Sequence, residues 1–236
     1  MKQDRLDKIL CGTGLYTRSE ARALILAGGV TVNGAPVRRP ETRVDRASAI
    51  MAGGEPVDGA EFLYLMMNKP AQYISGTRDE KYPAVTGLLP RHQQARGLFP
   101  AGRLDADVTG LLILTDDGAF AHRLTAPRQE VPKTYEAWVE NPMSFQAADI
   151  LRAGVPDGAG GAYKPAELSV DPADPCHAWV TVTEGRFHEV KNLLAYCGSP
   201  VVKMRRISIG GLQLDPALGP GEFRPMTEEE VQACFA

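Results

Sequence analysis

Four aspartates stand close together in the segment GRLDADVTGLLILTDDG, which covers residues 102 to 118. Asp105 and Asp107 form a D-x-D pair before an aliphatic run, and Asp116 and Asp117 follow that run. A D-x-D pair can bind a divalent cation, and two nearby carboxylates can act as the acid and base of a glycosidase. Asp105 is therefore a candidate catalytic or metal-binding residue, with a structural role in a turn as the alternative.

The arginine beside the D-x-D pair argues against a metal ion. If residues 103 to 107 are extended, Arg103 lies on the same face as Asp105 and Asp107, because side chains alternate along a strand. A guanidinium is an unusual neighbour for a bound cation, whereas it suits an anionic polymer. We therefore expect no metal here, and a metal-dependent nuclease stays only as an alternative function.

The second pair of aspartates is expected to be structural. Asp116 and Asp117 precede Gly118, between a short aliphatic strand and a segment whose apolar spacing is helical. Aspartate at such a junction accepts hydrogen bonds from the first backbone N–H groups of the helix, and glycine tolerates the geometry of the turn.

Length and composition limit the class of protein. The chain has 236 residues, enough for two domains, and 44% of them are hydrophobic. No apolar run is long enough to span a bilayer, and the charged N-terminus lacks the apolar centre of a signal peptide. We therefore expect a cytoplasmic protein with no membrane partner. The cysteines form no C-x-x-C pair, so we expect reduced thiols and no zinc site; they are Cys11, Cys176, Cys197 and Cys234.

The first 46 residues are basic, although the whole chain has a net charge of −3. They hold nine Lys or Arg and five Asp or Glu, whereas the remainder holds seventeen and twenty-four. RLDKILCGTG and SEARALILAGG have helical apolar spacing, with Ser19 as the candidate N-cap of the second helix. VTVNGAPV predicts a hairpin around Asn33-Gly34. Four of the arginines that flank these elements are Arg18, Arg22, Arg38 and Arg39.

This arrangement of helix, helix and hairpin resembles the small RNA-binding domain of ribosomal small-subunit protein four, the alpha-L RNA-binding motif. The resemblance implies that the flanking arginines contact RNA phosphates, which gives affinity without sequence readout. Residues 47 to 60 are rich in small residues and are expected to end this domain and form a linker. We therefore divide the chain into an RNA-binding domain with its linker at 1–58 and a larger domain at 59–236.

The larger domain is predicted to be α+β, with a mixed sheet that is mainly antiparallel. FLYLMMNKP and GLLILT are expected to be buried strands, and KTYEAWVE and HAWVTVTEG alternate as half-buried strands do. DDGAFAHRLTAP predicts a helix. RFHEVKNLLAYCG predicts another, with Phe187 and Val190 on its core side.

Five segments, in the same order along the chain, resemble the RsuA family of pseudouridine synthases, which act on small-subunit ribosomal RNA. They also resemble the relatives of this family that act on large-subunit ribosomal RNA. The segments are MNKPAQYISGT, GRLDADVTGLLILTDDG, PKTYEAWVE, TEGRFHEVKNLLAYCG and RRISIGGLQLDPALGPGEFRPMTEEE. The resemblance implies an isomerase that detaches the base of a uridine, turns it and rejoins it to the ribose through carbon. This reaction needs no cofactor, and Asp105 would be its essential group.

The resemblance also assigns roles to other residues. Tyr135 would stack on the flipped-out uracil, and Arg186 would pair with the carboxylate of Asp105. Arg103 would fill the space that the base leaves or hold flanking phosphates. Lys69 and Lys191 would bind the RNA backbone, with solvated surface as the alternative for both.

Other positions are expected to be structural or to depart from the family pattern. His188 is expected to be structural. Glu189 stands where the family usually has glutamine, and Asn192 stands where it often has a basic residue. Both departures reduce the positive charge on the RNA path.

The implied substrate is a specific uridine of ribosomal RNA, with uridine 516 of 16S rRNA as the first choice. The RNA partner would be small-subunit RNA or an assembly intermediate, bound by a monomer. A large-subunit target and a non-catalytic rRNA-binding assembly factor are the alternatives.

Overall fold

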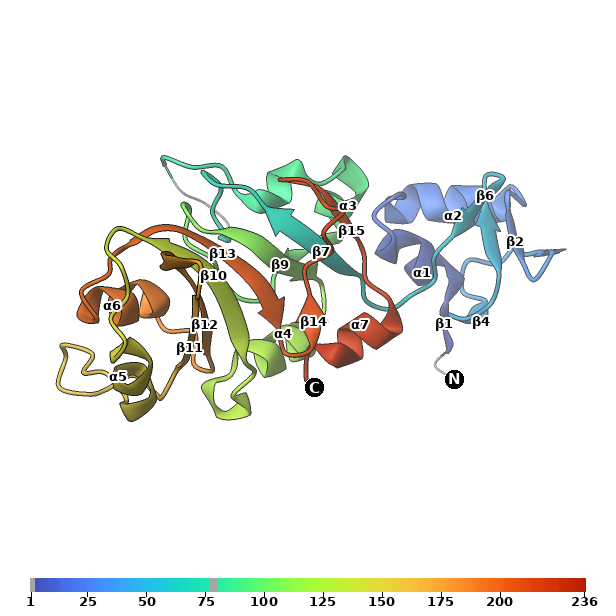
Figure 1. Cartoon of the computed structure of the whole chain (residues 1–236). Coiled ribbons are helices and arrows are strands. Elements are labelled where there is room, and N and C mark those ends of the chain that lie inside the picture. Colours follow the sequence, from blue (N-terminus) through green and yellow to red (C-terminus); the bar gives the residue numbers. More distant parts are fainter. Residues whose placement is uncertain (1–2, 77–79) are drawn as a thin grey trace. The chain divides into compact units, whose positions relative to one another are not determined.

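The computed structural model describes residues 3–76 and 80–236 (Figure 1). Within these ranges no helix is long and apolar enough to cross a membrane. The chain divides into two compact units. Unit 1 contains residues 1–63 and 86–98, and unit 2 contains residues 64–85 and 99–236. The expected boundary between residues 58 and 59 stays a prediction, and the second segment of unit 1 was not foreseen from the sequence.

Unit 1 is a pair of helices with short strands around a small core. Leu6, Ile9, Leu10 and Ile25 of the helices are all buried in this core. The helices and strands of this unit are β1 (Gln3–Arg5), α1 (Leu6–Gly12), α2 (Arg18–Leu26), β2 (Val30–Val32), β3 (Ala35–Pro36), β4 (Arg43–Asp45), β5 (Ile50–Ala52), β6 (Glu55–Val57) and α3 (Arg91–Arg96). A 3-10 helix spans Val85–Leu88.

The predicted hairpin is confirmed, and the predicted helix cap is wrong by two residues. β2 and β3 pair antiparallel, and Asn33 and Gly34 between them have φ angles of 51° and 80°, as a two-residue hairpin turn requires. Thr17, not Ser19, caps α2. Its hydroxyl accepts from the backbone N–H of Glu20, whose carboxylate accepts from the N–H of Thr17. This reciprocal pair satisfies two N–H groups that the helix leaves free.

Residues 47 to 60 are not simply a linker. They contain β5 and β6, which extend the small sheet in the order β3-β2-β5-β6. Ile50, Ala52 and Val57 are buried there, and Gly53-Gly54 forms the turn with positive φ at both residues. The small residues that suggested a linker are turn residues of a hairpin.

Unit 2 is built on a mixed sheet with the order β11-β12-β10-β13-β9-β7-β15. β13 and β9 are parallel and the other paired strands of this sheet are antiparallel, which confirms the predicted α+β class. Its elements are β7 (Tyr64–Lys69), β8 (Phe99–Pro100), β9 (Thr109–Thr115), α4 (Gly118–Thr125), a 3-10 helix (Pro127–Gln129), β10 (Lys133–Val139), α5 (Ala147–Ala153), β11 (Glu167–Asp171), β12 (Asp174–Val182), α6 (Glu189–Tyr196), β13 (Val201–Ile209), β14 (Leu212–Gln213), β15 (Phe223–Pro225) and α7 (Glu228–Ala233).

Two cores of buried apolar side chains hold the described residues of unit 2 together. In one, Leu151 of α5 and Leu193 of α6 pack with the inward side chains of β10 and β12. Along β10, Tyr135, Ala137 and Val139 are buried and their neighbours are not, which confirms the predicted alternation. In the other core, α4 packs with side chains of β7, β9 and β13.

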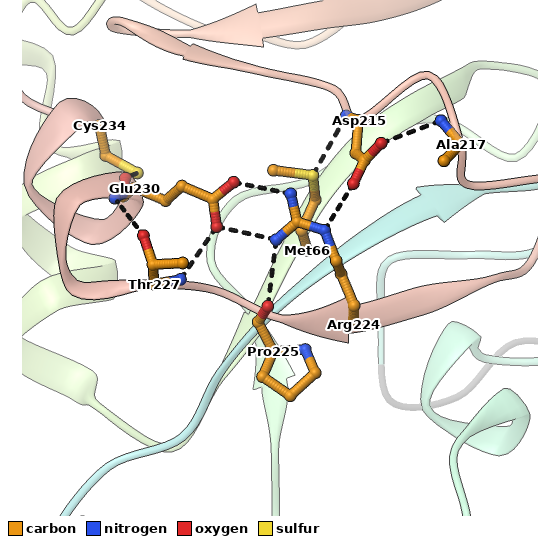
Figure 2. A network of polar contacts seen from close by, with 8 residues as sticks. All are labelled: Met66, Asp215, Ala217, Arg224, Pro225, Thr227, Glu230 and Cys234. Atoms are coloured by element: carbon orange, nitrogen blue, oxygen red, sulfur yellow. Dashed lines mark hydrogen bonds and ion pairs between the residues drawn. The ribbon is translucent and has the colours of Figure 1, made fainter.

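The C-terminal segment is fixed by one arginine (Figure 2). The guanidinium of Arg224 in β15 donates to Asp215 at 2.6 Å and to both carboxylate oxygens of Glu230 in α7 at 2.8 and 2.7 Å. These hydrogen bonds raise the pKa of Arg224 above its ordinary value. Thr227 caps α7 through a reciprocal pair with Glu230. The GEFRPMTEEE segment therefore closes the fold of unit 2 and adds no side chain to the site described below.

Candidate active site

Asp105 lies in the loop between β8 and β9, and several buried groups fix that loop. The N–H of Leu104 donates to the hydroxyl of Ser75, and the N–H of Val108 donates to the carbonyl of Asp105. Gly110, at the start of β9, has a φ of 101° and lies opposite Arg206 of β13 in the parallel pair. A side chain at Gly110 would collide with the backbone of Arg206. The loop therefore presents Asp105 from a rigid support.

Lys69 supports this loop from inside the protein, which corrects the expectation that it binds RNA. Its side chain is completely buried, and its ammonium donates to the carbonyls of Pro70, Ala106 and Val108 at 3.1, 3.4 and 2.8 Å. Burial lowers the pKa of Lys69 to about 8, opposed by the charges of Asp107 and Asp105. The group has no access to a phosphate, and it holds the backbone that carries Asp105.

Lys191 of α6 is the basic partner of the D-x-D pair. Its Nζ lies 2.9 Å from Oδ2 of Asp105, and 2.8 and 2.9 Å from Oδ1 and Oδ2 of Asp107. Burial would lower the pKa of Lys191, but the hydrogen bonds with Asp107 and Asp105 outweigh it and raise that pKa. Burial would likewise raise the pKa of Asp107, but Lys191 lowers it. The ammonium of Lys191 thus bridges the two carboxylates.

The expected pair between Arg186 and Asp105 is not present. Arg186 donates to Oδ2 of Asp157 at 2.7 Å and to the carbonyl of Ala162 at 3.1 Å, and its guanidinium lies 4.7 Å from the ring centre of Tyr163. Arg186 precedes the first residue of α6, whereas Lys191 lies within that helix. The side chain of Arg186 therefore contacts Asp157, whereas the side chain of Lys191 contacts Asp105.

A pocket of about 450 Å³ opens beside Asp105. Its lining includes Asp105, Tyr135, Arg186 and the turn that holds Phe187 and His188. Tyr135 is buried on the inner face of β10, with the guanidinium carbon of Arg206 6.0 Å from its ring centre. The pocket thus combines an aromatic side chain, a carboxylate and several cations.

Three other ionisable groups among the lining residues are Arg206, Lys133 and Glu189. Of these, only Glu189 was expected near the RNA path from the sequence. Arg206 is 2% exposed; its Nε donates to the carbonyl of Leu111, and its Nη2 is buried without a hydrogen-bond partner. The buried ammonium of Lys133 donates to the carbonyl of Val131. Burial, followed by the charge of Arg206, lowers the pKa of Lys133 to about 8. Side chains alternate between the two faces of a strand, so Lys133 lies on the same face of β10 as Tyr135. This pattern could have indicated from the sequence that Lys133 belongs to the site.

Glu189 is the third of these groups, and it caps the turn before α6. Its Oε2 accepts from the backbone N–H groups of Gly185 and Arg186 at 2.7 and 2.8 Å. Burial raises the pKa of Glu189, against the opposing effect of these hydrogen bonds. His188 precedes the helix with a φ of 54°, and its Nε2 lies 3.3 Å from Oδ2 of Asp105. His188 was expected to be structural, and the structure brings it next to Asp105.

The remaining predicted residues are dispersed. Arg103 is exposed and lines both the main pocket and a second pocket that includes Asp107 and Tyr82. Asn192 donates to the hydroxyl of Tyr163 at 2.7 Å. In unit 1 the four predicted arginines are all exposed; they are Arg18, Arg22, Arg38 and Arg39.

Asp116 and Asp117 lie outside the main pocket, at the junction of β9 and α4. Oδ1 of Asp117 accepts from the N–H groups of Ala119 and Phe120 at 2.9 and 3.0 Å. The predicted helix cap is confirmed for Asp117. Among the described residues, no cluster of His, Cys, Asp and Glu could hold a metal ion.

Comparisons with known proteins bear on both units. The family model described as RNA pseudouridylate synthase matches residues 63–196, and the S4 domain model matches residues 4–50. The chain is 42% identical to an uncharacterized RNA pseudouridine synthase of Bacillus subtilis, over 96% of each chain. It is 38% identical to the ribosomal small subunit pseudouridine synthase A of Escherichia coli, over 96% of this chain and 98% of that protein.

A solved structure agrees with these relatives. The crystal structure of a pseudouridylate synthase superimposes with a TM-score of 0.69 at 33% sequence identity. The match covers 98% of this chain and 99% of that chain. The similarity therefore extends over both units and not only over the segment that carries Asp105.

Proposed function

Since this chain belongs to the family of RNA pseudouridylate synthases and is an RNA-binding isomerase, we propose that it isomerises one uridine of small-subunit ribosomal RNA, uridine 516 of 16S rRNA. The name of the Escherichia coli relative, ribosomal small subunit pseudouridine synthase A, supports the choice of the small ribosomal RNA. The alternative is a uridine of the large ribosomal RNA, which the experiment below distinguishes.

Asp105 is the catalytic group of this proposal. The observation that carries it is the carboxylate of Asp105 at the edge of a pocket of about 450 Å³, held by Lys191 at 2.9 Å and supported by the buried Lys69 beneath its loop. The charge-assisted hydrogen bond from Lys191 fixes the direction of the carboxylate. Asp107 is exposed, does not line this pocket, and shares Lys191 as a supporting group.

The target uridine must leave the RNA stack to reach this pocket. We assign the aromatic face of Tyr135 to the flipped uracil, because a tyrosine ring offers a stacking surface to a base. The exposed Arg103, which lines the pocket and precedes Asp105 by two residues, is assigned to the space that the base leaves or to the flanking phosphates. Arg186 stays in the proposal as a substrate-binding residue at the pocket edge, without a contact to Asp105.

The basic N-terminal unit supplies affinity. Its exposed arginines suit the phosphate backbone, which attracts cations without regard to sequence. We propose that residues 1–58 act as an RNA clamp, that the enzyme works as a monomer in the cytoplasm, and that its substrate is small-subunit RNA or an assembly intermediate. The chemistry moves a base within one nucleotide, so no cofactor enters the proposal.

Mapping pseudouridines in ribosomal RNA from cells that lack this protein tests the proposal. We expect one missing pseudouridine, at uridine 516 of 16S rRNA, restored by the wild-type gene and not by the Asp105→Asn gene. A missing pseudouridine in large-subunit RNA would overturn the proposed target and keep the enzyme class. An unchanged map would overturn the ribosomal substrate.

A further inference from the structure

Phe187 is an exposed aromatic side chain at the edge of the active-site pocket. It is 76% exposed, although its sequence motif places it on the expected core side of a helix. The helix starts two residues later, at Glu189, so Phe187 belongs to the turn before it. Single exposed apolar residues are common on proteins, so the exposure of Phe187 alone does not indicate that it binds a ligand. Its position at the pocket and the contacts that hold its turn do indicate this.

Several interactions hold the turn that presents Phe187. The carboxylate of Glu189 accepts from the N–H groups of Gly185 and Arg186, on the N-terminal side of Phe187. The side chain of Arg186 is anchored on Asp157, whose own carboxylate accepts from the N–H groups of Ala159 and Gly161. The backbone before and after Phe187 is therefore fixed. An apolar side chain held toward solvent in this way is available for a ligand.

His188 contacts both the ring of Phe187 and the carboxylate of Asp105. The rings of Phe187 and His188 are stacked, with their centres 3.7 Å apart and an angle of 20° between their planes. Nε2 of His188 lies 3.3 Å from Oδ2 of Asp105, and all three residues line the same pocket. A nucleotide whose sugar reaches Asp105 therefore brings the next nucleotide of the strand near the outer face of Phe187.

We propose that Phe187 stacks on the base of the nucleotide next to the target uridine. This inference rests on the proposed function. Turning a uridine out of the RNA removes the stacking partner of its neighbour, and an aromatic face replaces part of that lost interaction. Phe187 is uncharged and exposed, so it recognises a base face and not a phosphate. Tyr135 inside the pocket and Phe187 at its edge then hold two consecutive bases.

The test compares Phe187→Leu, Phe187→Trp and a matched control, Phe145→Leu. Phe145 is another exposed phenylalanine of unit 2, and it does not line the pocket. The assay measures kcat/KM for pseudouridine formation in 16S rRNA taken from cells that lack the protein. We expect about a 5- to 150-fold loss for Phe187→Leu, from the usual strength of base stacking. Phe187→Trp keeps an aromatic face and should lose less than Phe187→Leu, whereas Phe145→Leu should keep the wild-type value.

Two further measurements separate base stacking from a role in supporting His188. In a His188→Ala background, Phe187→Leu should still cause the same fold loss, because the base and not the imidazole is its partner. The salt dependence of RNA binding should stay unchanged in Phe187→Leu, because no phosphate contact is lost. A loss that disappears in the His188→Ala background overturns the inference, and so does a Phe187→Leu enzyme with wild-type kcat/KM. If the wild-type protein modifies no ribosomal RNA, the proposed function itself has failed.

Discussion

Replacing Lys191 with methionine removes the cation that bridges the two carboxylates of the site. Nζ of Lys191 lies 2.9 Å from Asp105 and 2.8 Å from Asp107, and methionine keeps most of the apolar stem. A hydrogen bond to a charged group contributes about 1.5–3 kcal/mol. If the bond to Asp105 is needed in the transition state, Lys191→Met lowers kcat about 10- to 150-fold. Lys191→Arg keeps the charge and should lose less.

The assay follows from the chemistry of the reaction. The uracil carbon that joins the ribose loses its hydrogen, so RNA labelled with tritium at that carbon releases tritium as pseudouridine forms. Single-turnover release at saturating enzyme reports the chemical step. Lys203→Met is the matched control, because Lys203 is an exposed lysine on β13 whose Nζ lies 4.5 Å from the ring centre of Trp138. Its rate should stay at the wild-type value.

The rate of Lys191→Met decides whether Lys191 orients Asp105. If Lys191→Met folds, binds RNA as the wild type does, and releases tritium within about twofold of the wild-type rate, the lysine does not orient the reacting carboxylate. The carboxylate would then be positioned by the loop and by His188 alone. If Lys203→Met lowers the rate as much as Lys191→Met does, the loss is a general effect of removing positive charge.

Three more predictions concern other parts of the protein. Tyr135→Phe should keep most of the rate, whereas Tyr135→Leu should lose about 5- to 150-fold in turnover by the folded fraction; a Leu variant that is only less heat-stable would contradict the stacking role. Burial lowers the pKa of Lys69 to about 8 in the folded state, so the unfolded state binds more protons between this pH and 10.5 and the unfolding free energy should rise with pH. Lys69 should contribute at most about 3 kcal/mol of this rise, and Lys133, whose pKa is also lowered to about 8, should contribute in the same window, so denaturant unfolding of Lys69→Met should show a smaller rise that does not vanish. Arg38→Ala with Arg39→Ala should weaken RNA binding and make its salt dependence shallower by about 0.7–0.9 per lost phosphate contact, with an unchanged melting temperature because both side chains are exposed; an unchanged salt slope would argue against the clamp.

The sequence predicted those elements whose pattern has one physical meaning. The period-two pattern of KTYEAWVE can only be a half-buried strand, and Asn33-Gly34 fits a two-residue turn that few other pairs allow. Asp117 before Gly118 is likewise a strong helix cap. The cap of α2 was missed although the T-x-x-E spacing of Thr17 and Glu20 is visible in the sequence.

The contacts within the site could not be predicted in the same way. TEGRFHEVKNLLAYCG offers two basic residues, and the helix start decides which one reaches Asp105. That start depends on the positive φ of His188 and the cap from Glu189, neither of which the apolar spacing reveals. Lys69 ends a buried strand, and two of its three carbonyl partners, Ala106 and Val108, come from a loop more than thirty residues later. Such long-range polar contacts leave no local pattern.

Asp105→Asn is the most direct test of the catalytic role of Asp105. Asp105→Asn removes the reactive carboxylate and keeps the size of the side chain, which is 28% exposed. The measurement is tritium release from labelled 16S rRNA under single-turnover conditions, together with RNA affinity and melting temperature. Asp117→Asn serves as the control and should keep most of its activity, because asparagine is also a good helix cap. We predict that Asp105→Asn binds RNA and melts as the wild type does but forms no pseudouridine; substantial turnover by that variant would contradict the account.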